Sequence, residues 1–244
     1  MSLLPLLAPL LAALIAATCA AIWLVVPPSG DPRKEGDYRA LWRQVGTIAR
    51  DRRFWRYVPM STATQATVLS IGSLWTGPWL RDVAGLPDHV AADGLSVYSV
   101  GVLVGFLGTG WLAQQAGRHR LDTSMFVALT IGFVAIQLMI ILLPAAVGVW
   151  LWIAYMTLGV FAIHLYATTA RAFPVAMAGR VNALHNFIVF VAAFFVQWLF
   201  GVWLDRFPAD GGGALRSGYD TGFAILVVLQ LASLLPLALL RERR

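Results

Sequence analysis

Seven stretches of 20 to 24 residues contain no Asp, Glu, Lys or Arg, and together they make up most of the 244-residue chain. They are residues 3–26, 57–77, 95–115, 123–143, 147–170, 181–203 and 221–240. A helix needs about 20 apolar residues to cross the roughly 30 Å hydrocarbon layer of a bilayer, and each stretch is that long. The sequence therefore predicts an all-α integral membrane protein with seven transmembrane helices.

The composition narrows the possible partners and cofactors. The net charge of +6 resides between the apolar stretches, where basic residues more often set membrane topology than bind nucleic acid. Cys19 is the only cysteine, which excludes a disulfide framework and a zinc cluster held by thiolates. No paired carboxylates lie within a stretch, so we do not expect an enzyme. We expect the lipid bilayer as a partner, and no nucleic acid, metal ion or organic cofactor.

The first stretch occupies the position of a signal peptide. It has no basic residues before it, and its apolar run is longer than the usual apolar region of such a leader. We therefore interpret it as a retained transmembrane helix. A cleaved leader, or a lipid-attachment site at Cys19, is the alternative.

The basic residues predict the orientation in the membrane. Fifteen of the 18 Lys and Arg residues lie on alternate connections, within residues 33–56, 118–120, 171–180 and 241–244. The opposite connections hold only Arg81, Arg206 and Arg216. Because the more basic side of a membrane protein faces the cytoplasm, we expect the N-terminus outside and the C-terminus in the cytoplasm of a bacterial inner (plasma) membrane.

Three regions follow from this arrangement: a first transmembrane helix (1–27), a basic cytoplasmic loop (28–56) and a six-helix transmembrane bundle (57–244). Within the loop, Leu41, Val45 and Ile48 recur at helical spacing beside Trp42, with arginines on the other faces. This pattern predicts an amphipathic helix on the membrane surface. Binding of a regulatory partner is an alternative, but anchoring alone explains the pattern.

Residues 110–120 carry a recognisable motif. Their sequence, GWLAQQAGRHR, resembles the G-x-L-a-D-r-x-G-R-[KR] signature in the cytoplasmic loops of the major facilitator superfamily. The resemblance implies a motif for the conformational cycle made of Gly110, Gln114, Gly117, Arg118 and Arg120. Gln114 stands where the family usually has Asp, so the carboxylate that would pair with a basic group on a neighbouring helix is missing.

Two further segments extend the resemblance to nearly the whole chain. Residues 173–186 and 197–205 resemble the loop and helix 11 of these transporters, and residues 51–56 resemble the end of their central cytoplasmic loop. The seven stretches would then correspond to helices 6 to 12, the C-terminal half-bundle plus the preceding helix. The resemblance implies secondary active transport of a small solute by alternating access. We expect a truncated or split transporter that pairs with a missing N-terminal half or with a second copy of itself.

Two other classes of protein compete with this interpretation. The absence of five helices favours a non-transporting membrane interaction subunit or a nonfunctional remnant. A seven-helix receptor shares the number of spans and the external N-terminus, but the motifs and the short external loops weigh against it.

Candidate substrate contacts lie in the second and fifth stretches. The second stretch is the richest in hydroxyl and amide groups, and Gln65 is the preferred contact because a primary amide both donates and accepts hydrogen bonds. Its Ser and Thr hydroxyls could instead bond to their own helix. His164 and Tyr166 lie near the cytoplasmic end of the fifth stretch. His164 could be a proton relay, a substrate ligand or a hydrogen-bonded structural histidine.

Asn182, His185 and Asn186 begin the sixth stretch, where positions 182 and 186 lie one turn apart on one helix face. They are candidates for a cytoplasmic gate, although Asn182 could instead cap the helix. Because no stretch contains Asp or Glu, proton coupling would require a carboxylate from the missing half, or His164 in its place.

Two other patterns predict helix packing. Gln137 and Gln197 are isolated amides that we expect to join helices. Gly101-x-x-x-Gly105 permits close approach of a neighbouring helix, and we expect Gly108 and Gly110 to continue this small surface.

Overall fold

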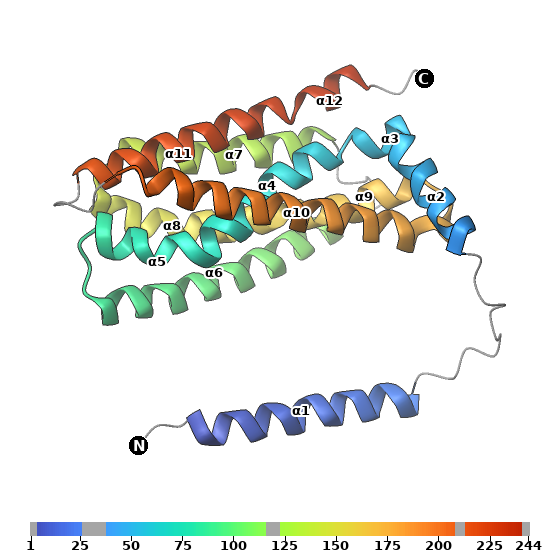
Figure 1. Ribbon diagram of the computed structural model, residues 1–244, viewed down its shortest axis with the longest axis horizontal. Coiled ribbons are helices and arrows are strands. Elements are labelled where there is room, and N and C mark those ends of the chain that lie inside the picture. Colours follow the sequence, from blue (N-terminus) through green and yellow to red (C-terminus); the bar gives the residue numbers. More distant parts are fainter. Residues whose placement is uncertain (1–3, 26–37, 116–122, 208–212, 241–244) are drawn as a thin grey trace. The chain divides into compact units, whose positions relative to one another are not determined.

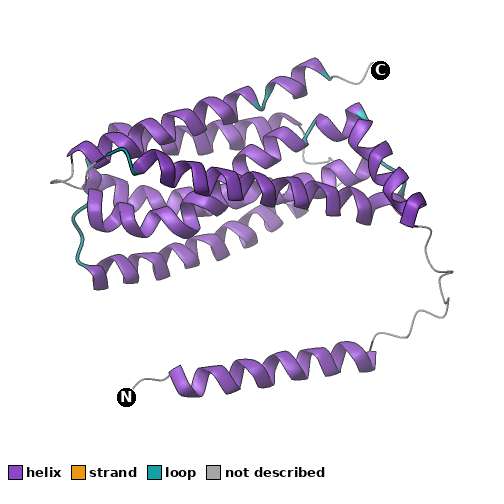
Figure 2. Ribbon diagram, in the orientation of Figure 1, coloured by secondary structure: helices purple, strands orange, loops and turns teal. Residues whose placement is uncertain are grey.

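The computed structural model describes residues 4–25, 38–115, 123–207 and 213–240. Within these ranges the regular structure is helical, and no strand occurs (Figures 1 and 2). The chain divides into two compact units, Met1–Gln44 and Val45–Arg244.

The first unit contains α1 (Leu4–Val25) and the beginning of α2 (Tyr38–Arg50). Every described residue of α1 is uncharged, whereas α2 carries arginines alongside the apolar residues that recur at helical spacing. The helix predicted within the basic loop is therefore confirmed. Binding of a regulatory partner to it stays a prediction.

The second unit is a bundle of long helices. Four are continuous: α6 (Asp88–Gln115), α7 (Thr123–Leu142), α10 (Ala178–Leu204) and α11 (Gly213–Ala232). A fifth path runs through α8 (Ala145–Gly159), the 3₁₀ turn η3 (Val160–Ile163) and α9 (His164–Arg171). The short elements are α3 (Arg52–Trp55), η4 (Val175–Met177) and α12 (Leu235–Leu239). In the bundle α4 (Val58–Ser70) packs on α10, α6 on α8, and α7 on both α8 and α11 (Figure 1).

Five segments of the described chain are long and apolar enough to cross a membrane. They are Asp88–Trp111, Thr123–Leu142, Ala145–Arg171, Val175–Leu204 and Gly213–Leu239. The chain is thus an all-helical integral membrane protein. The predicted total of seven spans is not confirmed. In α1 the apolar segment Ala12–Val25 is shorter than a membrane span, and the helix of the second predicted span is interrupted.

The second predicted span consists of α4 (Val58–Ser70), η1 (Ile71–Trp75), α5 (Thr76–Pro78) and η2 (Trp79–Val83). Both η segments are π-helical. The N–H of Ala84, for example, bonds to the carbonyl of Trp79, five residues earlier, at 3.0 Å. Pro78 between them has no N–H to donate and disturbs the regular ladder. The helical path continues to Val83 and ends at Gly85, whose φ of 68° makes the turn into α6.

The polar side chains of α4 lie inside the bundle. Ser61, Thr64, Thr67 and Ser70 are buried, and Ser70 Oγ donates a 2.7 Å hydrogen bond to the carbonyl of Ala193 in α10. Hydroxyls within hydrocarbon need such partners because no water replaces them. The hydroxyl-bearing face of this span therefore packs against other helices of the bundle.

The contact between α6 and α8 depends on two glycines. A Cβ atom on Gly105 would clash with the backbone of Thr157, and one on Gly101 would lie 3.1 Å from Thr157 Oγ1. The predicted close packing is confirmed there. The predicted continuation at Gly108 and Gly110 is wrong, because among the described residues no atom of a neighbouring helix lies within 4 Å of a Cβ at either position. Helices that cross at an angle touch over only a few turns, and α6 has left the contact by Gly108.

Two apolar clusters hold the helices together. The larger contains an aromatic group in which Trp152 lies 5.6 Å from Trp79, 5.0 Å from Tyr155 and 5.9 Å from Phe223, measured between ring centroids. The smaller lies where α3, α9 and α10 meet, and its members are Ile48, Phe54, Val58, Ala170, Phe173 and Val181. The candidate site residues Gln65, Tyr166, Asn182 and Asn186 lie on α4, α9 and α10, which these two clusters hold together.

Candidate functional site

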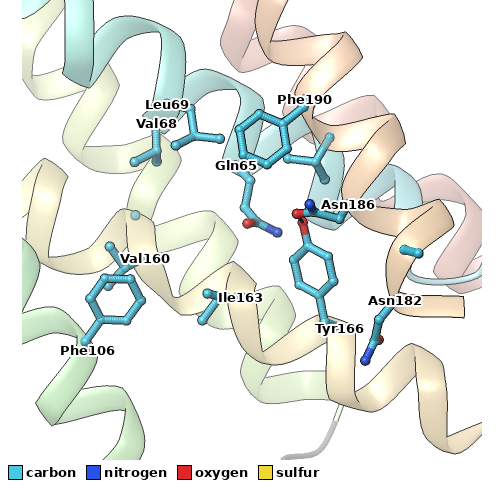
Figure 3. A pocket seen from close by; sticks show the side chains of 13 residues that line it. Gln65, Val68, Leu69, Phe106, Val160, Ile163, Tyr166, Asn182, Asn186 and Phe190 are labelled. Atoms are coloured by element: carbon cyan, nitrogen blue, oxygen red, sulfur yellow. Dashed lines mark hydrogen bonds between the residues drawn. The ribbon is translucent and has the colours of Figure 1, made fainter. Parts of the chain in front are cut away.

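A cavity of about 630 Å³ lies among α4, α6, η3, α9 and α10 (Figure 3). It is partly open and not enclosed. The residues that line it are Gln65, Val68, Leu69, Phe106, Gly159, Val160, Ile163, Tyr166, Asn182, Ala183, Asn186, Val189 and Phe190. None of them carries a charge, and most are apolar.

The polar part of the lining consists of Gln65, Tyr166, Asn182 and Asn186. Figure 3 shows the Gln65 amide extending from α4 toward the Tyr166 and Asn186 side chains of α9 and α10. Four of the six predicted substrate or gating residues therefore meet in one place, although they come from three separate segments of the chain. Their role in binding stays a prediction.

The hydrogen bonds of these residues leave capacity for a ligand. Gln65 Nε2 donates to Ser61 Oγ at 2.8 Å and to the carbonyl of Ala162 at 3.5 Å, and the Tyr166 hydroxyl donates to Asn186 Oδ1 at 3.1 Å. Asn182 Oδ1 is buried and accepts no hydrogen bond from any residue that the structure describes. Buried polar atoms almost always have a partner, so this carbonyl oxygen beside the cavity could accept a hydrogen bond from a solute or a water molecule.

The position of Asn182 within α10 decides between its two interpretations. The helix begins at Ala178 after the 3₁₀ turn η4, and Met177 occupies the N-cap. Asn182 therefore lies in the second turn, and the alternative that it caps the helix is wrong. It shares one face with Asn186, one turn later, and both side chains reach the cavity.

The two candidate histidines, His164 and His185, do not line the cavity. His185 is fully buried, and its ring stacks on that of Tyr166 with centroids 4.2 Å apart and planes inclined by 23°. A second aromatic neighbour is Phe54, whose ring centroid lies 6.2 Å from that of His185. Neither ring nitrogen of His185 has a partner within the described ranges, and the same is true of His164 Nε2. His185 therefore supports Tyr166, a wall residue of the cavity, whereas His164 begins α9 and is not among the lining residues.

The motif for the conformational cycle is only partly described. Gly110 and Gln114 lie near the end of α6, where the Gln114 side chain is exposed. Gly117, Arg118 and Arg120 lie outside the described residues. Among the described residues no group of three or more His, Cys, Asp or Glu side chains could hold a metal ion.

One polar residue that the sequence interpretation did not single out is Gln230 of α11. Gln137 Nε2 donates to Gln230 Oε1 at 3.1 Å, and Gln230 Nε2 donates to Gln137 Oε1 at 3.0 Å. The prediction that Gln137 joins helices is confirmed. A lone amide within residues 221–240 was the signal that could have identified its partner.

A family model described as Major Facilitator Superfamily matches residues 4–197, which include every residue that lines the cavity. The chain belongs to this superfamily. Its members are membrane transporters and not enzymes. Comparison with curated proteins and with solved structures gave no match.

Proposed function

We propose that this major facilitator protein moves a small solute across the membrane by alternating access, as a secondary active transporter, and that the cavity is its substrate site. The observation that carries the proposal is the convergence of Gln65, Tyr166, Asn182 and Asn186 on one cavity, with the Asn182 carbonyl oxygen unpartnered among described residues. Substrate sites of transporters built from helical repeats lie between the repeats near the bilayer midplane.

The proposal includes seven spans that correspond to helices 6 to 12, with α1 as the first and α4 to η2 as the second. The path from Val58 to Val83 supports this, because at 1.5 Å per residue its 26 residues extend about 39 Å, enough to cross a bilayer. The distribution of basic residues supports an external N-terminus and a cytoplasmic C-terminus in a bacterial inner membrane.

The incomplete enclosure of the cavity by this chain supports a partner. Twelve-helix carriers enclose their substrate between two halves, and this bundle supplies one wall. We propose that a separately encoded N-terminal half, or a second copy of this chain, supplies the other.

Uptake into proteoliposomes tests the proposal. The purified chain, alone and with its partner, is reconstituted and incubated with a mixture of small metabolites, and solutes that accumulate inside are identified by mass spectrometry. We expect Gln65→Ala and Asn182→Leu to reduce accumulation of the transported solute. Leu107→Ala, which alters an exposed residue of α6 that does not line the cavity, should not reduce it.

If the folded protein accumulates no solute, either alone or with its partner, the result would contradict transport. That outcome would favour a non-transporting membrane subunit. Equal accumulation by all three variants would leave transport in place but would reject this cavity as the site.

A further inference from the structure

A second cavity, of about 460 Å³, adjoins the first. We call the cavity with Gln65 the inner cavity and this one the outer cavity. Four residues line both: Val68, Leu69, Phe106 and Val160. The remaining lining of the outer cavity is Gly72, Ser73, Leu95, Tyr98, Ser99, Val102 and Met156. The shared residues show that the two cavities meet along one boundary.

The two cavities follow one another along the bundle. On the α4 path the outer cavity uses Ser73, eight residues beyond Gln65, which is about 12 Å of helix. On α6 and α8, which run in the opposite direction, it uses residues that precede those at the boundary, such as Val102 before Phe106 and Met156 before Val160. All three helices therefore place the outer cavity nearer the end of the bundle where α6 and α8 begin.

The outer cavity has no charged lining residue, and its hydroxyl groups already donate their protons. Ser99 Oγ donates to the carbonyl of Leu95 at 3.0 Å, the Tyr98 hydroxyl donates to the carbonyl of Val149 at 3.0 Å, and Ser73 Oγ donates to the carbonyl of Leu69. Only the acceptor capacity of these oxygens is left for a solute. A charged solute would lose hydration here without compensation, whereas an uncharged solute with an apolar body would not.

Phe106 is the largest of the four boundary residues and the only aromatic one. Figure 3 shows Phe106 and Val160 on the side of the inner cavity opposite Asn182 and Asn186. The Phe106 side chain is 43% exposed, so packing does not confine its ring on every side.

We propose that the two cavities are successive binding sites on one path for an uncharged solute with an apolar body, and that the Phe106 ring is the barrier between them. The ring must move aside for the solute to pass. This inference rests on the proposed transport function. It adds a second binding site, a class of solute and a residue that controls passage of the solute between the two sites.

Thiol accessibility tests the barrier without a substrate. Because Cys19 is the only cysteine, Cys19→Ser gives a background without thiols. In that background Ala183→Cys reports on the inner cavity and Ser73→Cys on the outer cavity, and both are small changes. The full chain in sealed membrane vesicles is treated with the impermeant cationic reagent MTSET, added from the side on which Ser73→Cys reacts faster. This choice of side makes the test independent of the predicted orientation.

With Phe106 in place, Ala183→Cys should react at least about tenfold more slowly than Ser73→Cys, because an obstructed path slows encounter. Phe106→Ala should raise the Ala183→Cys rate by about tenfold, and Phe106→Leu should raise it less. Leu107→Ala changes the adjacent residue, which lines neither cavity, and should leave the rate unchanged.

If Ala183→Cys reacts as fast as Ser73→Cys while Phe106 is present, the proposal that Phe106 is a barrier is overturned. A rate that neither Phe106→Ala nor Phe106→Leu raises overturns it as well. An unchanged Ser73→Cys rate in both variants verifies that they fold. Since no transported solute is involved, failure of this experiment is distinct from absence of uptake in proteoliposomes.

A second measurement tests the class of solute. Leu69→Cys places the thiol at the boundary, and its reaction rates with cationic MTSET and anionic MTSES are each divided by the rate with a small thiol in solution. Without charges nearby, the two normalised rates should agree within about threefold. A preference above about tenfold for either reagent would reveal charge along the path and overturn the uncharged class.

Discussion

Two groups of buried amides in this bundle differ in how their hydrogen bonds are completed. Gln137 of α7 and Gln230 of α11 are fully buried and bond to each other in both directions, at 3.1 and 3.0 Å. At the inner cavity, Gln65 Nε2 donates to Ser61 Oγ of its own helix at 2.8 Å and to the carbonyl of Ala162 in η3 at 3.5 Å. The buried Asn182 Oδ1 has no partner among described residues.

The difference separates a structural role from a binding role. An amide surrounded by hydrocarbon must find a partner within the protein, because no water is available to replace one. The pair of Gln137 and Gln230 meets this requirement and leaves nothing for a ligand. An unpartnered amide oxygen is tolerable where a cavity admits water or solute, which is the situation of Asn182.

The largest effect on stability is expected from breaking the paired amides. Gln137→Leu leaves the Gln230 amide buried without its partner and should lower the free energy of unfolding by about 2 kcal/mol. Gln137→Leu combined with Gln230→Leu removes both polar groups and should recover most of that loss. Reversible unfolding in mixed micelles, followed by circular dichroism, measures both changes.

The uptake of the single and double variants serves as the control, since neither residue lines the inner or the outer cavity. We expect their uptake per folded molecule to match that of the unaltered chain. If the double variant is as unstable as the single one, the shape of the side chains and not their hydrogen bonds accounts for the contact between α7 and α11.

The unpartnered amide should behave in the opposite way. Asn182→Leu removes an acceptor that has no bond to lose, so the free energy of unfolding should change by less than about 0.5 kcal/mol. Uptake of the transported solute should fall about tenfold, the equivalent of about 1.4 kcal/mol, because the hydrogen bond to the solute is lost. A stability loss as large as that of Gln137→Leu, with uptake intact, would make Asn182 a structural residue.

The transmembrane helices of the bundle were predictable because uncharged stretches of sufficient length need no tertiary information. Their ends were less so. The stretch predicted to end at residue 77 continues to Val83 through two π-helical segments, and α10 begins at Ala178, three residues before the predicted start. Both differences arise where a proline or a 3₁₀ turn changes the pattern of backbone hydrogen bonds. The length of an uncharged stretch contains no information about that pattern.

The polar half of the inner cavity was also predictable, since few polar groups occur in these stretches and each needs a reason to be there. Phe106 and Val160 were not, because an apolar side chain can equally face lipid, core or cavity. The direction of His185 could not be foreseen either. It is three positions from Asn182, but its ring packs against Tyr166 and Phe54 and does not line the cavity.

His185 is a third kind of buried polar group, because it has no hydrogen-bond partner among the described residues and does not line the inner cavity. His185→Phe keeps an aromatic ring against Tyr166 and removes two nitrogens that lack partners among the described residues. The free energy of unfolding should therefore rise by about 1 kcal/mol while uptake stays unchanged. Unfolding in micelles and uptake in proteoliposomes measure the two quantities. A stable variant that no longer transports would show that the imidazole takes part in the transport cycle.

The smallest effect is expected at a polar group outside the spans, where water competes with protein partners. Asp51 caps α3 by accepting the Arg53 backbone N–H at 2.8 Å, and its carboxylate also pairs with the Arg53 guanidinium at 2.8 Å. The side-chain hydrogen bond from Arg53 lowers the pKa of Asp51 below its ordinary value of 3.8. The stabilisation is therefore complete above that value and is lost as the pH falls through the lowered pKa of the folded protein.

Asp51→Ala should accordingly lower the free energy of unfolding by about 0.5 to 1 kcal/mol near neutral pH. The difference from the unaltered chain should shrink as the pH is lowered from about 4, because the protonated carboxyl is a weaker acceptor for the N–H and the guanidinium. Unfolding in micelles at a series of pH values measures this, with Arg52→Ala, which alters the adjacent exposed residue, as the control. A difference that persists unchanged in acid would show that Asp51 acts through packing. Charge would then contribute nothing at this position, in contrast to the amides inside the bundle, whose effects should not vary with pH.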